Sequence, residues 1–134
     1  MAFKPILCMD FDGVINSYES GWLDDVCHLP DPPVRGAISF LEDATNFWKV
    51  CIYSSRSHHI GAPEAMKKWL IKYAMLEASE QGTDLDYVLN WINQIEFPTY
   101  KPPAKLSIDD RGMRFDGVFT DPEELLKIEP WYKV

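Results

Sequence analysis

The stretch CMDFDG, residues 8–13, decides how the rest of this sequence is interpreted. It closes an apolar run with two aspartates, Asp10 and Asp12, which a glycine follows at once. If a strand continued through this point, the two carboxylates would point to opposite faces. They can share a site only where the strand ends and the backbone turns, and Gly13 permits that turn. The stretch therefore predicts a buried strand over residues 6–9 with a polar site at its carboxyl end.

The composition indicates one acidic domain. The 134 residues, 46% of them hydrophobic, can bury one substantial core but not two, so a single domain over residues 1–134 is expected. The formal net charge of -8 disfavours broad binding to a phosphate backbone, which needs clustered Lys and Arg. A local basic pocket is still compatible with this composition. A nucleic-acid substrate therefore stays open, although the charge does not favour it.

Neither the cysteines nor the apolar segments favour secretion or membrane insertion. Cys8, Cys27 and Cys51 are odd in number and form no CxxC pair, so reduced, structural thiols are expected. No apolar stretch approaches the roughly 20 residues that span a bilayer, and the N-terminus lacks the layout of a signal peptide. We expect a cytoplasmic protein that makes no use of a membrane.

Hydrophobic periodicity predicts alternating strands and helices. The clearest helix covers residues 62–82, with Pro63 near its start and Gly82 as its stop. The other expected elements are strands over 6–9, 48–55, 94–100 and 105–108, helices over 34–47, 84–93 and 121–128 (the last capped by Asp121), an edge strand or loop over 113–119, and a long loop or small hairpin over 14–33. This alternation is typical of an α/β fold with a mostly parallel sheet, whose ligands bind beyond the carboxyl ends of the strands.

Polar residues of complementary chemistry follow the expected strands. They are Asp10 and Asp12 after the first strand, Ser54 in the second, Lys101 after the third, and Asp109 and Asp110 after the last. Because parallel strands bring their carboxyl ends to one edge, these residues are expected to converge although they lie up to 100 positions apart. Carboxylate oxygens hold Mg²⁺, while a lysine and a serine can face phosphoryl oxygens. The pattern therefore predicts a site for magnesium and a phosphoryl group.

Four short segments occur in the order found in the haloacid dehalogenase superfamily. They are DFDGV at 10–14, YSSR at 53–56, KPPA at 101–104 and IDDR at 108–111. They resemble the DxDG[TV] motif, the Ser or Thr, the Lys and the final acidic motif of the phosphatases in that superfamily. The stretch KPPAKLSIDDRGMRFDG also resembles the ending of small bacterial and phage members. The resemblance covers residues 6 to about 117 and implies a three-layer α/β/α, Rossmann-like fold with no sizeable cap domain.

The resemblance implies a Mg²⁺-dependent phosphohydrolase that acts through an aspartyl-phosphate. Asp10 would be the nucleophile, Asp12 the general acid and base, and Ser54 a hydrogen-bonding partner of the phosphoryl group. Further contacts to a phosphorylated small molecule or macromolecule are expected from Gly13, Ser55 and Arg56. A capless site favours either a macromolecular substrate or closure by a partner subunit, so a homo-oligomer stays open.

The same resemblance implies the metal ligands. Mg²⁺ would be held by the Asp10 carboxylate, by the backbone carbonyl of Asp12 and by an acid of the final motif. Asp110 is the preferred ligand of that motif, with Asp109 as its support, and the choice between them stays open. Arg111, directly after this pair, is expected to orient the acids through an ion pair.

Two lysines compete for the role of neutralising the phosphoryl charge. If residues 105–109 are extended, Lys105 lies ~13 Å before Asp109, at ~3.3 Å per residue, toward the wrong end of the sheet. Lys101 is therefore preferred. The link from Lys101 to Lys105 is too short for a helical crossover between parallel strands, so the strand expected at 94–100 need not pair with that at 105–108.

The acidic residues of this sequence also occur in three other kinds of protein. An EF-hand loop over residues 8–19 would place Cys8 at its first ligand position and leaves no room for the entering helix. A receiver-like signalling domain also combines acids, a hydroxyl and a lysine, but its acidic pair follows the first strand, whereas here the pair comes late. A catalytically silent binding module on the same fold stays open, because a fold alone does not establish activity. His58 and His59 are expected in a solvated loop, with no ligands at zinc spacing.

Overall fold

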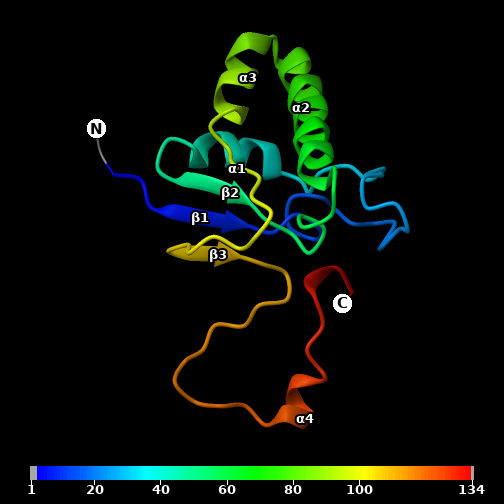
Figure 1. Ribbon diagram of the computed structural model, residues 1–134, viewed down its shortest axis with the longest axis vertical. Helices are drawn as coiled ribbons and strands as arrows, with labels where there is room; N and C mark the ends of the chain where they lie inside the picture. The colour runs from blue at the N-terminus through cyan, green and yellow to red at the C-terminus, as the bar shows by residue number, and fades with distance from the viewer. Residues whose placement is uncertain (1–2, 134) are drawn as a thin grey trace.

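A computed structural model describes residues 3–133, which form an α/β domain around a parallel sheet (Figure 1). The elements are β1 (Ile6–Met9), α1 (Ala37–Ala44), β2 (Lys49–Ile52), α2 (Ala62–Gln81), α3 (Leu85–Ile92), β3 (Leu106–Ile108), α4 (Pro122–Leu125) and the 3-10 turn η1 (Trp131–Lys133). The expected α/β class and the parallel sheet are confirmed.

The strand order β2-β1-β3 places β1 at the centre of the sheet. Both neighbours run parallel to it, and Cys8 pairs with Cys51 on one side and with Ser107 on the other. The chain passes from β1 first to β2 and only later to β3 on the opposite side. The carboxyl end of β1 is therefore a topological switch point, the place where open α/β sheets bind ligands.

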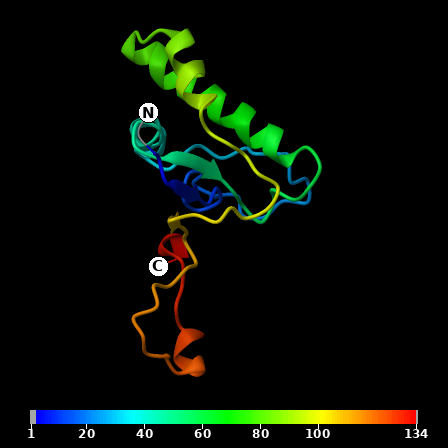
Figure 2. The ribbon, with the colours of Figure 1, turned by 60° about the vertical axis from the view of Figure 1, so that its left-hand side comes forward.

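Alternate residues of the two longer strands face the main core. Leu7 and Met9 of β1 join Val50 and Ile52 of β2 in one buried cluster with side chains from α1, α2 and α3. These helices gather at one end of the molecule, away from the C-terminal residues (Figure 2). Cys8 and Cys51 alternate with these core residues and point to the opposite face, where both are buried. All three cysteines are free thiols, as expected.

The long helix follows its sequence signals closely. Pro63 lies in the first turn of α2, and Gly82 ends the helix in the left-handed conformation, which a residue without a Cβ adopts at little cost. Trp69 of α2 packs edge-to-face on Phe11, with ring centroids 4.9 Å apart, and its indole N–H donates to the carbonyl of Asp31. One side chain therefore ties the helix to the turn after β1 and to the loop before α1.

The strand expected over residues 94–100 does not form. Only Glu96 makes a bridge, and it pairs with Cys51 on the side of β2 that faces away from β1. Pro98 removes a backbone donor within this segment, and Pro102 and Pro103 remove two more just after it, which prevents a continuous ladder. The segment therefore crosses to the opposite edge of the sheet as a coil, so no helical crossover is needed before β3.

The expected elements near the C-terminus are also shorter than predicted. Residues 113–119 form a loop and no strand, and the helix expected over 121–128 is limited to the four residues of α4. The Asp121 cap is confirmed, because its carboxylate accepts the N–H of Glu123. The helix expected over 34–47 and the strand over 48–55 are shortened at both ends to α1 and β2. Among residues 3–133 no helix combines the length and apolarity needed to span a bilayer.

Candidate active site

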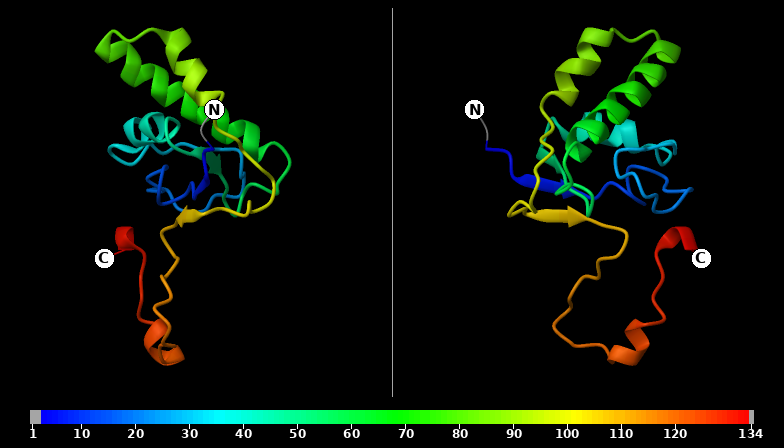
Figure 3. Two further views of the ribbon diagram at one scale, coloured as in Figure 1. Left: turned by 90° about the vertical axis from the view of Figure 1, so that its left-hand side faces the viewer. Right: turned by 45° about the vertical axis from the view of Figure 1, so that its right-hand side comes forward.

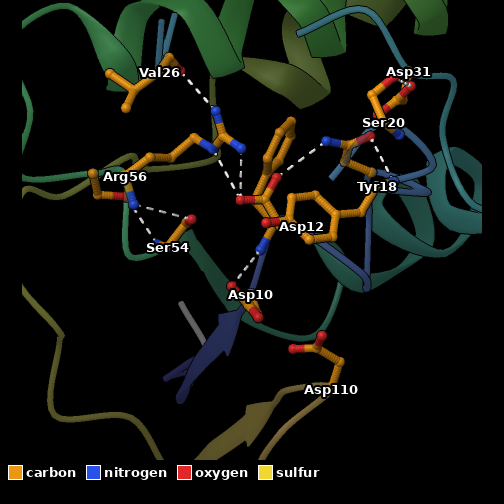
Figure 4. Close-up of polar contacts among 12 residues, drawn as sticks. Asp10, Asp12, Tyr18, Ser20, Val26, Asp31, Ser54, Arg56 and Asp110 are labelled. Carbon is orange, nitrogen blue, oxygen red and sulfur yellow. Dashed lines mark hydrogen bonds and ion pairs between the residues drawn. The ribbon is translucent and has the colours of Figure 1, made fainter. Parts of the chain in front are cut away.

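A pocket of about 510 Å³ opens at the carboxyl ends of the three strands. Its lining includes the four predicted acids, Asp10, Asp12, Asp109 and Asp110, together with Ser54 and Lys101. The close-up shows Asp10 and Asp12 on the turn after β1, flanked by Ser54 after β2 and by Asp110 after β3 (Figure 4). The convergence predicted from the strand ends is therefore observed in the structure.

Three of the acids form a tight cluster. Asp10, Asp109 and Asp110 each place a carboxylate oxygen within 4.8 Å of the others. The parallel ladder brings them together, because the Asp10 N–H donates to the carbonyl of Ile108 at 3.0 Å, immediately before the acidic pair. The Asp110 side chain is only 3% exposed, whereas Asp109 lies in solvent. Either residue of the pair can thus reach a cation that Asp10 also contacts.

Burial among like charges perturbs Asp10. Desolvation is the main cause that raises the pKa of this carboxyl to about 8, and the neighbouring Asp110 acts in the same direction. The Phe11 N–H, which donates to Asp10 Oδ1 at 2.8 Å, opposes the shift. Asp10 is therefore ionised at neutral pH only when a positive charge lies beside it. The carboxylate oxygens of Asp10, Asp109 and Asp110 are ligands of the kind that Mg²⁺ prefers.

Asp12 lies outside this cluster and is held by a different set of partners. Its Oδ2 accepts from Nε and Nη2 of Arg56 at 2.9 and 2.8 Å, and its Oδ1 accepts from the Asn16 amide at 3.1 Å. Burial raises the pKa of the Asp12 carboxyl, and the adjacent guanidinium opposes that effect. The Asp12 carboxylate is thus oriented by protein groups, while a metal contact through its backbone carbonyl stays a prediction.

Of the two arginines that follow a motif, Arg56 makes the closer contact with an acid of the site. Arg56, expected to contact substrate, is buried outside the pocket lining and donates through Nη1 to the carbonyl of Val26 as well as to Asp12. Its guanidinium also lies 5.1 Å from the centre of the Trp22 ring. Arg111, expected to orient the acids, is mostly exposed and approaches Asp110 only to 3.8 Å. The difference follows burial: Arg56 comes after β2, where Val50, Cys51 and Ile52 are buried, whereas Arg111 comes after β3, whose residues are exposed or half-buried.

The two serines after β2 differ in exposure. Ser54 is buried, and its Oγ accepts the N–H of Arg56 at 3.3 Å, so that contact leaves the hydroxyl proton free to donate. Its own N–H donates to the Ser57 hydroxyl, which fixes the turn. Ser55 is exposed at the rim, and both Ser54 and Ser55 line the pocket. Both are therefore placed to meet a ligand.

The structure separates the two candidate lysines as the strand geometry predicted. Lys101 lines the pocket, and among the described residues no carboxylate lies within ion-pair distance of its ammonium. The N–H of Lys105 donates to the carbonyl of Ile6, which places Lys105 at the amino end of the sheet. Lys101 is therefore the lysine available to an anion in this pocket.

Gly13 occupies a position where a Cβ would collide with two neighbouring side chains. Its φ is +79°, and a Cβ there would come within 2.5 Å of Asp110 Oδ2 and 2.6 Å of Tyr132 Cε1. Its carbonyl accepts the indole N–H of Trp131 at 2.7 Å. Gly13 is not part of the pocket lining, so its substrate contact stays a prediction, and its observed role is to let Asp110 approach the turn.

Several aromatic residues at the site were not predicted from the sequence. Tyr18, Trp22 and Tyr53 line the pocket, and Tyr132 lies edge-to-face with Tyr18. The only available signal was the presence of Tyr18 and Trp22 in a polar loop, where no core required them. His58 and His59 are exposed and outside the pocket, as expected of a solvated loop.

Comparisons with known protein families, with curated proteins and with solved structures found no match. Function must therefore be inferred from the side chains and their arrangement.

Proposed function

We propose that this protein is a Mg²⁺-dependent phosphomonoester hydrolase of the haloacid dehalogenase type, in which Asp10 is the nucleophile. The observation that carries the proposal is the meeting of Asp10 with Asp109, Asp110, Ser54 and Lys101 in one pocket. The finer fold assignment, a three-layer α/β/α Rossmann-like domain without a sizeable cap, belongs to the same proposal. The central position of the strand that carries Asp10 supports it.

The acidic cluster fits the metal. Asp10 with Asp109 or Asp110 offers hard oxygen ligands within a small volume. Among residues 3–133 the only ion pair to these acids is the 3.8 Å approach of Arg111 to Asp110, so one cation faces three carboxylates. Bound there, Mg²⁺ would supply charge neutralisation for the nucleophile and the phosphoryl oxygens. The remaining chemistry falls to side chains of the chain.

The first half-reaction breaks the ester bond. A carboxylate oxygen of Asp10 attacks phosphorus, and the ester oxygen departs with a proton from Asp12. Lys101 and the Ser54 hydroxyl face the transferring phosphoryl group and stabilise its charge. The products of this step are a free alcohol and an aspartyl-phosphate on Asp10.

The second half-reaction regenerates the enzyme. Asp12, now ionised, removes a proton from water, the water oxygen attacks phosphorus, and inorganic phosphate leaves Asp10. The two hydrogen bonds from Arg56 stabilise ionised Asp12 for this step, whereas burial favours the neutral form needed for the first step. Arg56 is thus a positioning residue for Asp12.

The proposed substrate is a phosphorylated small molecule or macromolecule with room for its phosphoryl group in the pocket of about 510 Å³. The free thiols support the cytoplasmic location expected from the sequence. A receiver-like domain or a silent binding module would share the acidic site, so turnover must be measured directly.

The test is hydrolysis of an aryl phosphate and of a panel of alkyl phosphomonoesters, with Mg²⁺ or with EDTA. Activity should require the metal, and Asp10→Asn should reduce it to background while circular dichroism stays unchanged. Undiminished turnover in EDTA would contradict the metal assignment. Stable phosphorylation without turnover would favour the receiver-like domain, and neither reaction with any ester would favour the silent module.

A further inference from the structure

The C-terminal loop, defined as residues 111–133, leaves the sheet after β3 and returns to it only at η1 (Figure 3). Both ends are held at the candidate active site. Arg111 approaches Asp110 at one end, and Trp131 donates its indole N–H to the Gly13 carbonyl at the other. Between these anchors every residue from 112 to 129 is exposed. The middle of the loop therefore lies away from the core that the sheet and α1–α3 form (Figure 3).

This exposed loop is unusually apolar. Of the 18 large hydrophobic side chains that are exposed in the described part of the chain, eight lie in it: Met113, Phe115, Val118, Phe119, Leu125, Leu126, Ile128 and Trp131. A cavity of about 410 Å³ lies inside the loop, lined in part by Met113, Leu125 and Ile128. Monomeric soluble proteins rarely expose contiguous apolar patches larger than a few hundred Å².

We propose that the C-terminal loop is the surface through which two copies of this chain associate, each loop packing on the other. The exposed parts of the eight side chains amount to about 900 Å² per copy, taking roughly 180 Å² for a large apolar side chain. A standard stable interface buries about 800 Å² on each partner. The total apolar area that the loop exposes is thus comparable with the area that a stable dimer buries on each partner.

The charge distribution favours a second copy at this surface and disfavours one elsewhere. The loop carries four basic and five acidic residues, so it contributes only one of the chain's eight net negative charges. Two bodies that hold the remainder repel one another, whereas two loops meet almost without net charge. A self-complementary contact about a two-fold axis is also the commonest arrangement of homodimers.

The test is the association state of the full chain, measured by sedimentation velocity over a wide range of concentration. The informative variant is Phe119→Asp, and its matched control is Phe3→Asp, because each phenylalanine is 90% exposed. Phe119→Asp should raise the dimer dissociation constant by more than about tenfold, as expected for a central apolar contact. Phe3→Asp should leave it unchanged. Since neither residue is buried in one copy, both variants should fold, which circular dichroism checks.

A second pair of variants and a measurement of amide hydrogen exchange test the same interface independently. Leu126→Asp should weaken association as Phe119→Asp does, while Ile60→Asp should not, although Ile60 is fully exposed. Amide hydrogen exchange in residues 113–129 should be slow in concentrated samples and fast after dilution. A chain that is monomeric at every concentration would overturn the proposal. So would a dimer that tolerates Phe119→Asp and Leu126→Asp.

Discussion

The four residues Phe-Asp-Gly-Val occur twice in this chain, at 11–14 and at 115–118, and the two copies have different surroundings. Phe11 is fully buried against Trp69, whereas Phe115 is 57% exposed and contacts Phe119 of the same loop. The carboxylate of Asp12 accepts hydrogen bonds from Arg56 and Asn16, whereas that of Asp116 accepts the nearby N–H of Val118.

The four residues determine the local turn, whereas the fold determines which distant side chains contact it. Both copies place a glycine at positive φ, so the local turn tendency is shared. The two copies differ in their partners from distant parts of the chain. Arg56, after β2, and Asp110, after β3, lie beside the first copy and not beside the second. The side chains that surround the motif thus depend on the central strand that precedes it, and the four residues alone do not determine them. The first three predictions below change one position in both copies.

The largest difference is expected for the aspartates. Asp12→Asn should slow hydrolysis of an alkyl phosphate by about 10² to 10⁴, the range of general acid-base effects, and Asp116→Asn should leave it unchanged. With an aryl phosphate the loss should be smaller, because a good leaving group needs little protonation. Steady-state rates on both substrates at saturating Mg²⁺ check this. An equal loss on the two esters would mean that Asp12 is not the proton donor.

The phenylalanines should differ in stability. Phe11→Ala removes a fully buried ring from the core and should lower the free energy of unfolding by about 3–5 kcal/mol. Phe115→Ala should change it by no more than about 0.5 kcal/mol, as for most exposed positions. Urea denaturation at low protein concentration measures both, so that any dimer is dissociated. Similar losses at the two positions would show that the C-terminal loop is packed in the isolated chain.

The glycines should differ by the room available for a methyl group. Each substitution to alanine imposes the cost of positive φ, about 1–2 kcal/mol. Gly117→Ala adds no contact, because nothing lies within 4 Å of its Cβ position, whereas Gly13→Ala would push against Asp110 and Tyr132. Gly13→Ala should therefore also weaken Mg²⁺ binding, measured by titration calorimetry. Unchanged metal affinity in Gly13→Ala would separate Asp110 from the metal site.

The last prediction of this comparison concerns pH. Because burial raises the pKa of Asp10 to about 8, the folded state holds this proton more tightly than the unfolded chain does. The stabilisation is complete below the ordinary pKa and is lost as the pH rises through about 8. In EDTA the melting temperature should therefore fall from about pH 4 to about pH 8 and level off above that, and Mg²⁺ should reduce the fall.

The controls for this pH dependence use the same pair of regions. Asp10→Asn should flatten the decline in EDTA, since the titrating group is gone, while Asp116→Asn should melt as the wild type does. A decline that persists unchanged in Asp10→Asn would assign it to other groups.

The sequence predicts the parts of this molecule that local physics determines. Residues 62–82 carry their own start and stop signals, and the polar residues at strand ends converge once the sheet is parallel. The strand expected at 94–100 was wrong because prolines outweighed its apolar pattern. The position of Lys105 followed from strand length alone, and the structure agrees.

What the sequence could not supply are contacts that depend on long-range packing. No local sequence signal distinguishes Arg56 from Arg111, since each directly follows a motif. Arg56 forms the hydrogen bonds to Asp12 because the turn after β2 buries it beside that carboxylate. Likewise the contact of Trp131 with Gly13 joins residues 118 positions apart through a loop with no ordered strand. A contact of this kind depends on how the C-terminal loop folds back onto the sheet, and no sequence motif predicts that.

The most direct test of the central claim is detection of the phosphoryl group on Asp10. The Asp12→Asn variant is mixed with an aryl phosphate and Mg²⁺, quenched in acid and analysed by peptide mass spectrometry. We predict one phosphoryl group, located on Asp10, absent in EDTA and absent when Asp10→Asn is added, with the peptide that contains Asp116 unmodified throughout. Turnover of the ester by the wild-type protein with no phosphorylation of Asp10 in the variant would contradict the account.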